Sequence, residues 1–295
     1  MDLLRLPLLV LIDVFKNMDN REKFLISFMS KRAKNTLNLT SAPSEFSFQL
    51  SESFLIQPEE WDSRIYMKTN KENYLIGGEL MRLSFNPRGI TLKNETPRNQ
   101  LLLASHVLDA FPKSTISVAF YDPILPATAL EFMTMINQRK FFIKAFTYCM
   151  TEVSSFKFVP ELLDECTKVT ESIKIHAAFP DVFVYTPLRP FKAASLKMFG
   201  NTNWFDLENF MSCRDVIIKL RIMSKRTAQT YNSFFSKWMD SDGPLQKLTL
   251  FCITKPEYRM IMDALNNQLV SLSLFVIKFN ILGEPCNKLT HIGSN

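Results

Sequence analysis

The residues of this chain that could act together chemically are lysines inside a recurring apolar-x-apolar triplet. The triplet occurs at residues 116–118, 143–145, 173–175, 196–198, 218–220 and 248–250. Side chains alternate across a β-strand, so the middle residue of each triplet should face solvent when the outer two face the core. The middle residues are Ser117, Lys144, Lys174, Lys197, Lys219 and Thr249. Strands lying side by side would then present a row of lysines.

A second set of side chains follows two residues further along the same face: Ala119, Phe146, His176, Phe199, Arg221 and Phe251. Neighbouring lysines repel one another, and a surface made only for water rarely carries phenylalanines. The pattern therefore indicates capture of an acidic segment of a target protein, with the phenylalanines as apolar anchors. The predicted target-binding residues are Lys144, Phe146, Lys174, His176, Lys197, Phe199, Lys219, Arg221 and Phe251. A plain solvated lysine face is the alternative.

Side chains for catalysis, cofactor binding or metal binding are scarce in this sequence. The chain has only 7 glycines and 3 histidines, and it lacks the GxSxG, HExxH, P-loop and GxGxxG motifs. Neither His106 nor His176 has a second histidine or cysteine at metal-ligand spacing. We therefore expect no catalysis, no cofactor and no metal.

The cysteines indicate a reducing compartment. Five cysteines are present, far apart and without CxxC spacing, and this odd number is typical of reduced thiols. The apolar stretch at residues 3–15 includes Asp13 and is followed by no small-residue cleavage site, while the stretch at residues 269–282 is interrupted by polar residues. We therefore expect no secretory signal and no membrane anchor, and we predict a cytoplasmic or nuclear protein.

Composition excludes a disordered chain but leaves the type of partner open. Hydrophobic residues make up 46% and charged residues 22% of the 295 residues, which is enough to bury a large core. A formal charge of +6 and a pI near 9.0, beside many aromatic residues, would also suit nucleic-acid binding. The charge is mild and no nucleic-acid-binding motif is visible, so nucleic acid is the less favoured partner.

The triplets recur at steps of 27, 30, 23, 22 and 30 residues, each long enough for one strand and one helix. Apolar residues at helical spacing predict helices at residues 127–138, 204–211 and 228–239. Strands separated by helices stack in parallel, so this part of the α/β chain should form an irregular solenoid that resembles leucine-rich repeats. Ahead of it, residues 44–94 alternate with period two and contain glycine turns, which predicts a small antiparallel β block.

The first forty residues predict three short helices. Pro7 suits the first turn of a helix, and Asp19 with Glu22 forms a capping-box pattern that begins a second one. The first helix is apolar on all sides, which is more than three short helices can bury against one another. Its surplus apolar faces should contact either the rest of this chain or a second protein.

The segment LPLLVLIDVFKNMDNREKFLISFMSKRAKNTL resembles an F-box, in the divergent form common in nematode proteins. The Leu6-Pro7 start, the helix start at residues 19–22 and Ser30-Lys31-Arg32 follow its order, while Leu9 stands where many F-boxes carry an acidic residue. The resemblance implies binding to a Skp-family adaptor and, through it, to a cullin-RING ubiquitin ligase. The adaptor-binding residues that it implies are Pro7, Leu8, Leu11, Phe15, Met18, Phe24, Met29, Lys31 and Arg32.

A second resemblance covers the later part of the chain. Residues 232–238, NSFFSKW, and 245–250, LQKLTL, resemble the most recognisable motif of the type 2 F-box-associated domain. The two resemblances imply an F-box at residues 1–40, a β-rich connecting block at 41–98, a repeat-like substrate-binding domain at 99–268 and a tail at 269–295 without an assigned role. They imply a non-catalytic substrate-recognition subunit of an SCF-type ubiquitin ligase. A nucleic-acid-binding or general protein-interaction module is the alternative.

Overall fold

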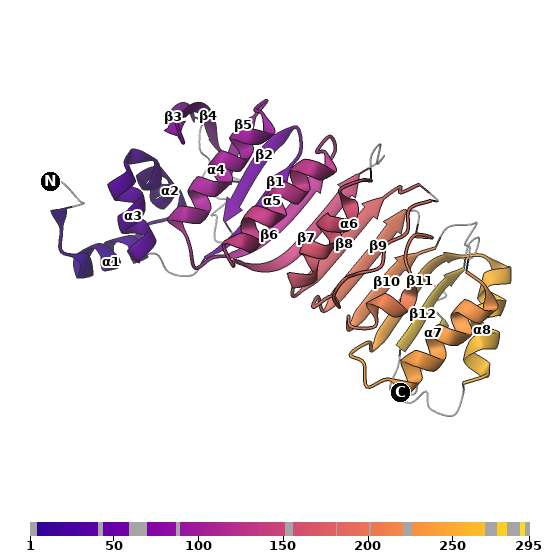
Figure 1. The fold of residues 1–295 in the computed structure, drawn as a ribbon. Coiled ribbons are helices and arrows are strands. Elements are labelled where there is room, and N and C mark those ends of the chain that lie inside the picture. The colour runs from indigo at the N-terminus through magenta and orange to yellow at the C-terminus, as the bar shows by residue number, and fades with distance from the viewer. Residues whose placement is uncertain are drawn as a thin grey trace. The chain divides into compact units, whose positions relative to one another are not determined.

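The computed structural model describes residues 5–40, 44–58, 70–86, 89–150, 156–180, 182–200, 202–220, 226–268, 276–281 and 290–292. They form a mixed α/β protein, as predicted, with two compact units, Met1–Lys144 and Ala145–Asn295. Within each unit, helices cover one face of a β-sheet (Figure 1). The predicted residue Arg221 and much of the tail lie outside the described residues.

Three helices begin the first unit: α1 (Leu8–Asn17), α2 (Asn20–Met29) and α3 (Lys31–Thr40). They confirm the three helices expected from the sequence, and we refer to them as the N-terminal module. The predicted capping box opens α2: the Glu22 N–H donates to Asp19 Oδ1 at 2.7 Å, and the Asp19 N–H donates to Glu22 Oε2 at 3.1 Å. These bonds satisfy backbone donors that a helix start leaves unpaired.

The strands of the first unit are β1 (Glu45–Leu50), β2 (Ser53–Pro58), β3 (Asn70–Ile76), β4 (Glu79–Asn86), β5 (Gly89–Lys93) and β6 (Thr115–Tyr121). β1, β2, β5, β4 and β3 pair antiparallel in that order, which confirms the predicted β block. β1 also pairs in parallel with β6. This pairing brings the block into one unit with α4 (Pro97–Ala110) and α5 (Pro126–Gln138), so the compact unit ends at Lys144 and not between residues 98 and 99.

The second unit is a stack of parallel strands: β7 (Phe142–Met150, its first residues in the first unit), β8 (Ser172–Ala177), β9 (Ser195–Gly200), β10 (Asp215–Lys219), β11 (Lys247–Ile253) and β12 (Val276–Ile281). They pair in chain order, which confirms the predicted parallel repeat. β13 (Thr290–Ile292) then pairs antiparallel with β12. The two described segments of the tail, to which the sequence assigned no role, therefore extend the sheet.

The strands of the second unit are connected by α6 (Val159–Glu165), the 3₁₀ turns η2 (Cys166–Lys168) and η3 (Leu207–Phe210), α7 (Ala228–Asp240) and α8 (Lys255–Asn266). α5 and α7 confirm the helices predicted at residues 127–138 and 228–239. The helix predicted at 204–211 is wrong, because only the short η3 turn forms there. Between β8 and β9 the described residues form no helix.

The segment NSFFSKW lies on α7 and fills the core of the second unit. Phe234, Phe235 and Trp238 are almost completely buried. The Trp238 indole N–H donates to the Leu245 carbonyl at 2.8 Å, which provides the partner that a buried indole requires. The aromatic residues of the second resemblance therefore hold the helix against the sheet.

The register of β7 differs from the predicted alignment of the triplets. Lys144 and Ala145 are both half-buried, so the alternation shifts by one residue at this point and Phe146 is fully buried. Thr147, rather than Lys144, lies opposite Lys174 of β8. Phe146 is a core residue, and the prediction that it binds a target is wrong.

The register of β10 differs as well. Ile217 lies opposite Lys197 of β9, and Lys219 stands in the next row, opposite Phe251. The triplet at residues 218–220 is therefore shifted by two residues along the sheet relative to the triplet at 196–198 in β9. The predicted row of four lysines is reduced to one direct pair, Lys174 opposite Lys197.

A buried hydrogen bond connects α7 to α8 and yields a prediction. The Tyr231 hydroxyl donates to Glu257 Oε1 at 2.6 Å, and both side chains are buried. The variant Glu257→Ala leaves the hydroxyl without this acceptor and creates a cavity. We expect the free energy of unfolding to fall by about 2–4 kcal/mol, measured by urea unfolding followed by tryptophan fluorescence.

The matched control for this experiment is Asp263→Ala, which removes an exposed carboxylate from the same helix. An exposed substitution of this kind should change the free energy of unfolding by about 0.5 kcal/mol or less. Equal stability of the two variants would contradict the structural role of the buried pair.

Candidate functional site

Apolar side chains remain exposed at the start of α1. Leu8, Leu9 and Val10 expose 51%, 77% and 44% of their surfaces, whereas Leu11 and Phe15 are buried. A helix that packs through one stripe needs only that stripe to be apolar. The exposed side chains therefore do not serve the core of this unit. We refer to Pro7, Leu8, Leu9 and Val10 as the α1 surface.

The structure divides the residues predicted to bind an adaptor into three groups. Met18 is half-buried, and the exposed members are Pro7, Leu8, Met29, Lys31 and Arg32. Leu11, Phe15 and Phe24 are buried within the first unit, so they do not belong to the exposed surface. Leu9 and Val10 were not among the predicted residues, although the absence of any polar residue in the first turn of α1 was a signal for them.

Phe24 attaches the N-terminal module to the sheet of the first unit. Its ring lies 5.6 Å from that of Phe46 in β1 and 5.1 Å from that of Phe111, directly after α4. The Phe46 and Phe111 rings are 5.1 Å apart and complete the cluster. Such aromatic contacts contribute beyond the burial of apolar area, so the module is packed firmly against the sheet.

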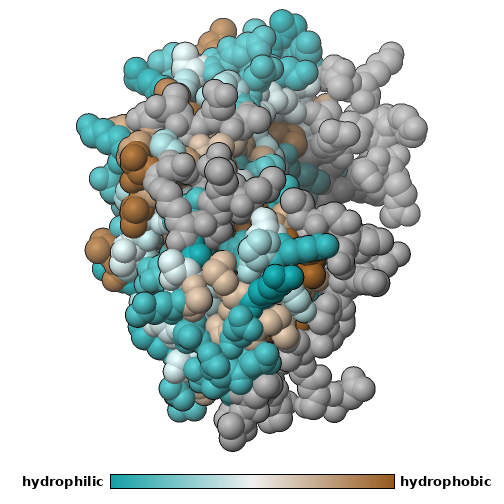
Figure 2. Space-filling view, turned by 90° about the vertical axis from the view of Figure 1, so that its right-hand side faces the viewer, coloured by the Kyte–Doolittle hydropathy of each residue, from teal (hydrophilic) through white to brown (hydrophobic). Residues whose placement is uncertain are grey.

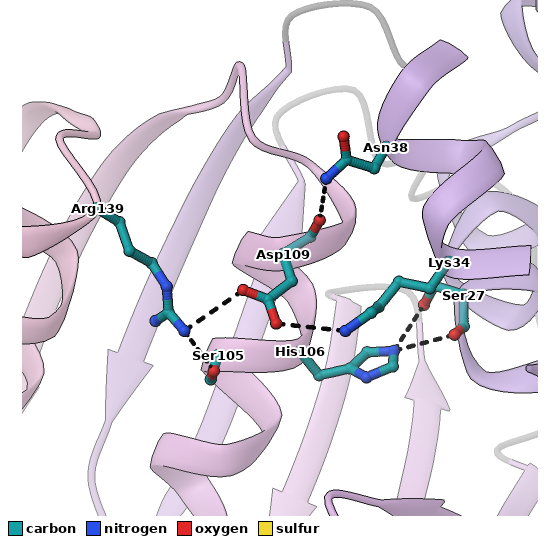
Figure 3. Close-up of polar contacts among 7 residues, drawn as sticks. All are labelled: Ser27, Lys34, Asn38, Ser105, His106, Asp109 and Arg139. Carbon is teal, nitrogen blue, oxygen red and sulfur yellow. Dashed lines mark hydrogen bonds and ion pairs between the residues drawn. The ribbon is translucent and has the colours of Figure 1, made fainter. Parts of the chain in front are cut away.

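Polar contacts around Asp109 of α4 reinforce this attachment (Figure 3). Its carboxylate oxygens lie 3.3 Å from Lys34 Nζ and 3.4 Å from Arg139 Nη2. Asn38 Nδ2 donates to the Asp109 carbonyl at 2.7 Å, and Arg139 Nη2 donates to Ser105 Oγ at 2.6 Å. Residues from α3, from α4 and from the end of α5 thus meet at one acidic residue. We refer to this set, together with His106 and Ser27, as the polar joint.

His106 links α4 to α2 within the polar joint. Its Nε2–H donates to the Ser27 carbonyl at 3.1 Å, with Ser27 Oγ at 3.3 Å, and its ring stacks on Phe28 at 4.9 Å. Burial and the nearby positive charge of Lys34 lower the pKa of His106 from 6.5 to about 4, against the opposing influences of the Ser27 carbonyl and Asp109. His106 is therefore a neutral structural residue at neutral pH.

The lowered pKa of His106 predicts a pH dependence of stability. Above pH 6.5 the residue is neutral in both the folded and the unfolded chain. As the pH falls from 6.5 towards 4, the unfolded chain binds a proton that the folded chain excludes, so the free energy of unfolding decreases. At pH 5 the titration of His106 should lower the free energy of unfolding by about 2 kcal/mol relative to neutral pH.

Urea unfolding at pH 7 and pH 5, followed by circular dichroism, measures this effect. His106→Gln retains an N–H donor for the Ser27 carbonyl but cannot titrate, so its stability should fall less between the two pH values than that of the unmodified protein. His176→Gln, at an exposed position in the other unit, is the matched control and should keep the original dependence. A parallel decrease in all three proteins would show that His106 is not responsible.

The second unit presents a basic face on the side of its sheet opposite the buried triplet residues. Lys174 lies directly opposite Lys197, and His176 lies directly opposite Phe199. Lys219 and Phe251 form the next pair along the sheet. The lysines and His176 are exposed, while both phenylalanines are half-buried. We refer to Lys174, His176, Lys197, Phe199, Lys219 and Phe251 as the basic face.

Acidic neighbours on this face are few. Asp215 is directly opposite Lys247 and lies 3.7 Å from Arg214 Nε. Within the described part of the chain, no carboxylate lies within 4.0 Å of the ammonium groups of Lys174 and Lys197. Two adjacent positive charges without a matching acid are unfavourable for the isolated sheet, and they are complementary to an acidic partner.

Lys144 does not belong to the basic face. Its Nζ lies 2.8 Å from Glu45 Oε2 within the first unit. The prediction that Lys144 binds a target is therefore not supported by its position, because the irregularity in β7 moves it out of the row.

A group of exposed apolar residues in the second unit was missed by sequence reasoning. Val182, Val184 and Leu188 expose 78%, 73% and 82% of their surfaces, while Phe183 and Tyr185 between them are buried. The signal was the alternation V-F-V-Y in a segment flanked by prolines, which is typical of extended chain. On the face drawn in Figure 2, the described residues are mainly hydrophilic, and the hydrophobic residues occur in small groups.

The residues that the structure describes contain neither a metal-binding cluster nor a membrane-spanning helix. No group of three or more histidine, cysteine, aspartate or glutamate side chains among them could hold a metal ion. No helix formed by these residues is long and apolar enough to cross a membrane.

Comparison of the chain with models of protein families, with curated proteins and with solved structures finds no match. The features of the described residues that bear on function are the α1 surface, the polar joint and the basic face.

Proposed function

We propose that this protein is a substrate-recognition subunit of an SCF-type ubiquitin ligase. Its N-terminal module binds a Skp-family adaptor and, through that adaptor, a cullin-RING ligase. Its second unit binds a target protein. The observation that carries the proposal is the α1 surface, where apolar side chains stay exposed although Leu11 and Phe15 of the same helix are buried.

The exposed side chains offer apolar surface that an adaptor would bury on docking. Burying an aliphatic side chain of this size contributes roughly 1.5–3 kcal/mol. Leu8 and Leu9 are 51% and 77% exposed, so together they could contribute about 2–4 kcal/mol to adaptor binding, before the cost of association is subtracted. Exposed Lys31 and Arg32, at the start of α3, would supply charge at the edge of the contact.

The attachment of the module supports this role. Phe24 and the polar joint hold α2 and α3 against α4, and these contacts leave the first turn of α1 exposed. A bound adaptor would then sit in a defined position relative to the sheet of the first unit. Ubiquitin transfer in such an assembly depends on proximity, because a raised effective concentration of the target lysine requires no catalytic group in this chain.

The basic face supports target binding through charge. Lys174 and Lys197 are adjacent and exposed, and Phe199 and Phe251 lie beside the positive charges in the neighbouring row. We infer that this face binds an acidic segment of the target. Binding would occur in the cytoplasm or the nucleus, where the ligase and its targets meet.

The double variant Leu8→Asp/Leu9→Asp tests adaptor binding. It replaces two apolar contacts with charges that are costly to bury, so affinity for a Skp-family adaptor should fall about a hundredfold or more. The measurement is co-expression with the adaptor, followed by size-exclusion chromatography and titration of the purified proteins.

Leu75→Asp/Leu80→Asp is the matched control for this test. These leucines are also exposed and lie opposite one another in the β3–β4 hairpin of the same unit. The control should bind the adaptor as the unmodified protein does. Full binding by the Leu8→Asp/Leu9→Asp variant would reject the α1 surface as the docking site.

The triple variant Lys174→Gln/Lys197→Gln/Lys219→Gln tests the basic face. We expect its affinity for a glutamate-rich peptide to fall about tenfold or more, since it loses three positive charges near the anchoring phenylalanines. Lys168→Gln/Lys192→Gln/Lys255→Gln removes the same number of exposed positive charges elsewhere in the second unit and should have a smaller effect.

A single-stranded oligonucleotide serves as the second probe in the same titration. The basic face and the pI near 9.0 make nucleic-acid binding the second candidate function. Tighter binding of the oligonucleotide than of the peptide, with a steep loss of affinity as salt increases, would favour that function over target capture.

A further inference from the structure

A thiol and an imidazole meet on the basic face. Cys149 of β7 and His176 of β8 are direct partners in the parallel register, so their side chains project from the same face of adjacent strands. Cys149 Sγ lies 3.8 Å from His176 Nδ1, which is within hydrogen-bonding range for sulfur. Cys149 is half-buried and His176 is exposed, so small molecules can reach the pair.

One aromatic ring lies beside the imidazole. The Phe199 ring, opposite His176 on β9, meets the imidazole edge-on with centroids 6.0 Å apart. In the tautomer protonated on Nε2, Nδ1 accepts the hydrogen of the Cys149 thiol. A thiol next to a base of this kind forms the nucleophile–base arrangement that promotes attack by sulfur.

The other described cysteines lack this arrangement. Burial raises the pKa of the Cys166 thiol well above its usual range and that of the Cys213 thiol to about 12. Both thiols are shielded from solvent, and a buried thiol in apolar surroundings is inert. Cys252 is half-buried like Cys149, and no hydrogen bond to a histidine is found for it among the described residues. It therefore provides an internal reference for reactivity.

Two lysines lie near the pair on the same face of the sheet. Lys174 lies two residues before His176 on the same face of β8, and Lys197 is its direct partner on β9. Both side chains are exposed. A reagent that carries carboxylates would therefore be concentrated near Cys149 relative to a neutral one.

We propose that Cys149 and His176 form a reactive pair for thiol–disulfide exchange with small disulfides that carry carboxylates. His176 Nδ1 takes the proton of the thiol, and the sulfur attacks one sulfur of the disulfide. A new disulfide bond forms at Cys149 as the original one breaks. The departing thiolate takes the proton from the imidazolium and leaves as a free thiol. Cys149 is oxidised to a mixed disulfide, and the released half of the reagent is reduced.

Exchange with glutathione disulfide tests this proposal. The full-length protein carries Cys286→Ser in every case, because Cys286 lies outside the described residues and would add its own signal. Peptide mass spectrometry over time gives a rate for each cysteine. We expect Cys149 to react about tenfold faster than Cys252, and Cys166 and Cys213 to stay unmodified while the protein is folded.

Two variants separate the contributions of the base and of the charge. His176→Ala should slow modification of Cys149 about tenfold with glutathione disulfide and equally with the neutral bis(2-hydroxyethyl) disulfide. Lys174→Gln/Lys197→Gln should slow the reaction with glutathione disulfide about threefold and leave the neutral reagent unaffected. Circular dichroism confirms that each variant is folded, and His176→Gln serves as the second variant at this exposed position.

Equal rates at Cys149 and Cys252, or an unchanged rate in the histidine variants, would overturn the reactive pair. Equal slowing of both reagents by the lysine variant would overturn the preference for carboxylates. A consequence that rests on the proposed function is that the bulky anionic group would interfere with target binding at the basic face. The exchange rates are measured without target or adaptor, so the two hypotheses succeed or fail separately.

Discussion

The register between parallel strands is the constraint on which the chemistry of the second unit depends. Each strand buries one set of alternate side chains and exposes the other, so a shift of one residue exchanges the two sets. The pairing of β8 with β9 places Lys174 beside Lys197, and the pairing of β7 with β8 places Cys149 beside His176. The positive charges of Lys174 and Lys197 and the Cys149 thiol lie on the same face of the sheet, because the register of the strands places both.

In the first unit, the helices that attach the N-terminal module to the sheet are different from the helix that carries the exposed apolar side chains. α2 and α3 supply the contacts to the sheet and to α4, through Phe24, His106 and the polar joint. α1 has its buried residues, Leu11 and Phe15, within the unit and keeps its first turn exposed. This division lets an apolar surface persist without weakening the core, because the residues that stabilise the unit are not the ones left exposed.

Much of the architecture could be predicted from local sequence patterns. Helical spacing and the capping box at Asp19 predicted the three N-terminal helices, and the repeated triplets predicted the parallel strands. These features follow from the periodicity of a single element and need no knowledge of its neighbours. The antiparallel block was predictable for the same reason, whereas its parallel link to β6 was not, because β1 and β6 are far apart in the sequence.

The sites were harder to predict because they depend on contacts between elements. The half-buried residues Lys144 and Ala145 shift the alternation within β7, and nothing in the triplet pattern indicates that shift. Burial of Phe146 and the ion pair of Lys144 with Glu45 both follow from it. The polar joint is equally invisible in the sequence, since Lys34, Asp109 and Arg139 come from three separate segments.

The end of the strand stack at β13 has a consequence for self-association. The outermost strand of a sheet offers backbone N–H and C=O groups on which a strand of another molecule can assemble. In the described part of the second unit this position is occupied by β13, which runs antiparallel to β12 and has three residues. So short a strand offers only a few hydrogen-bonding groups, which makes it a poor template for end-to-end growth into fibres.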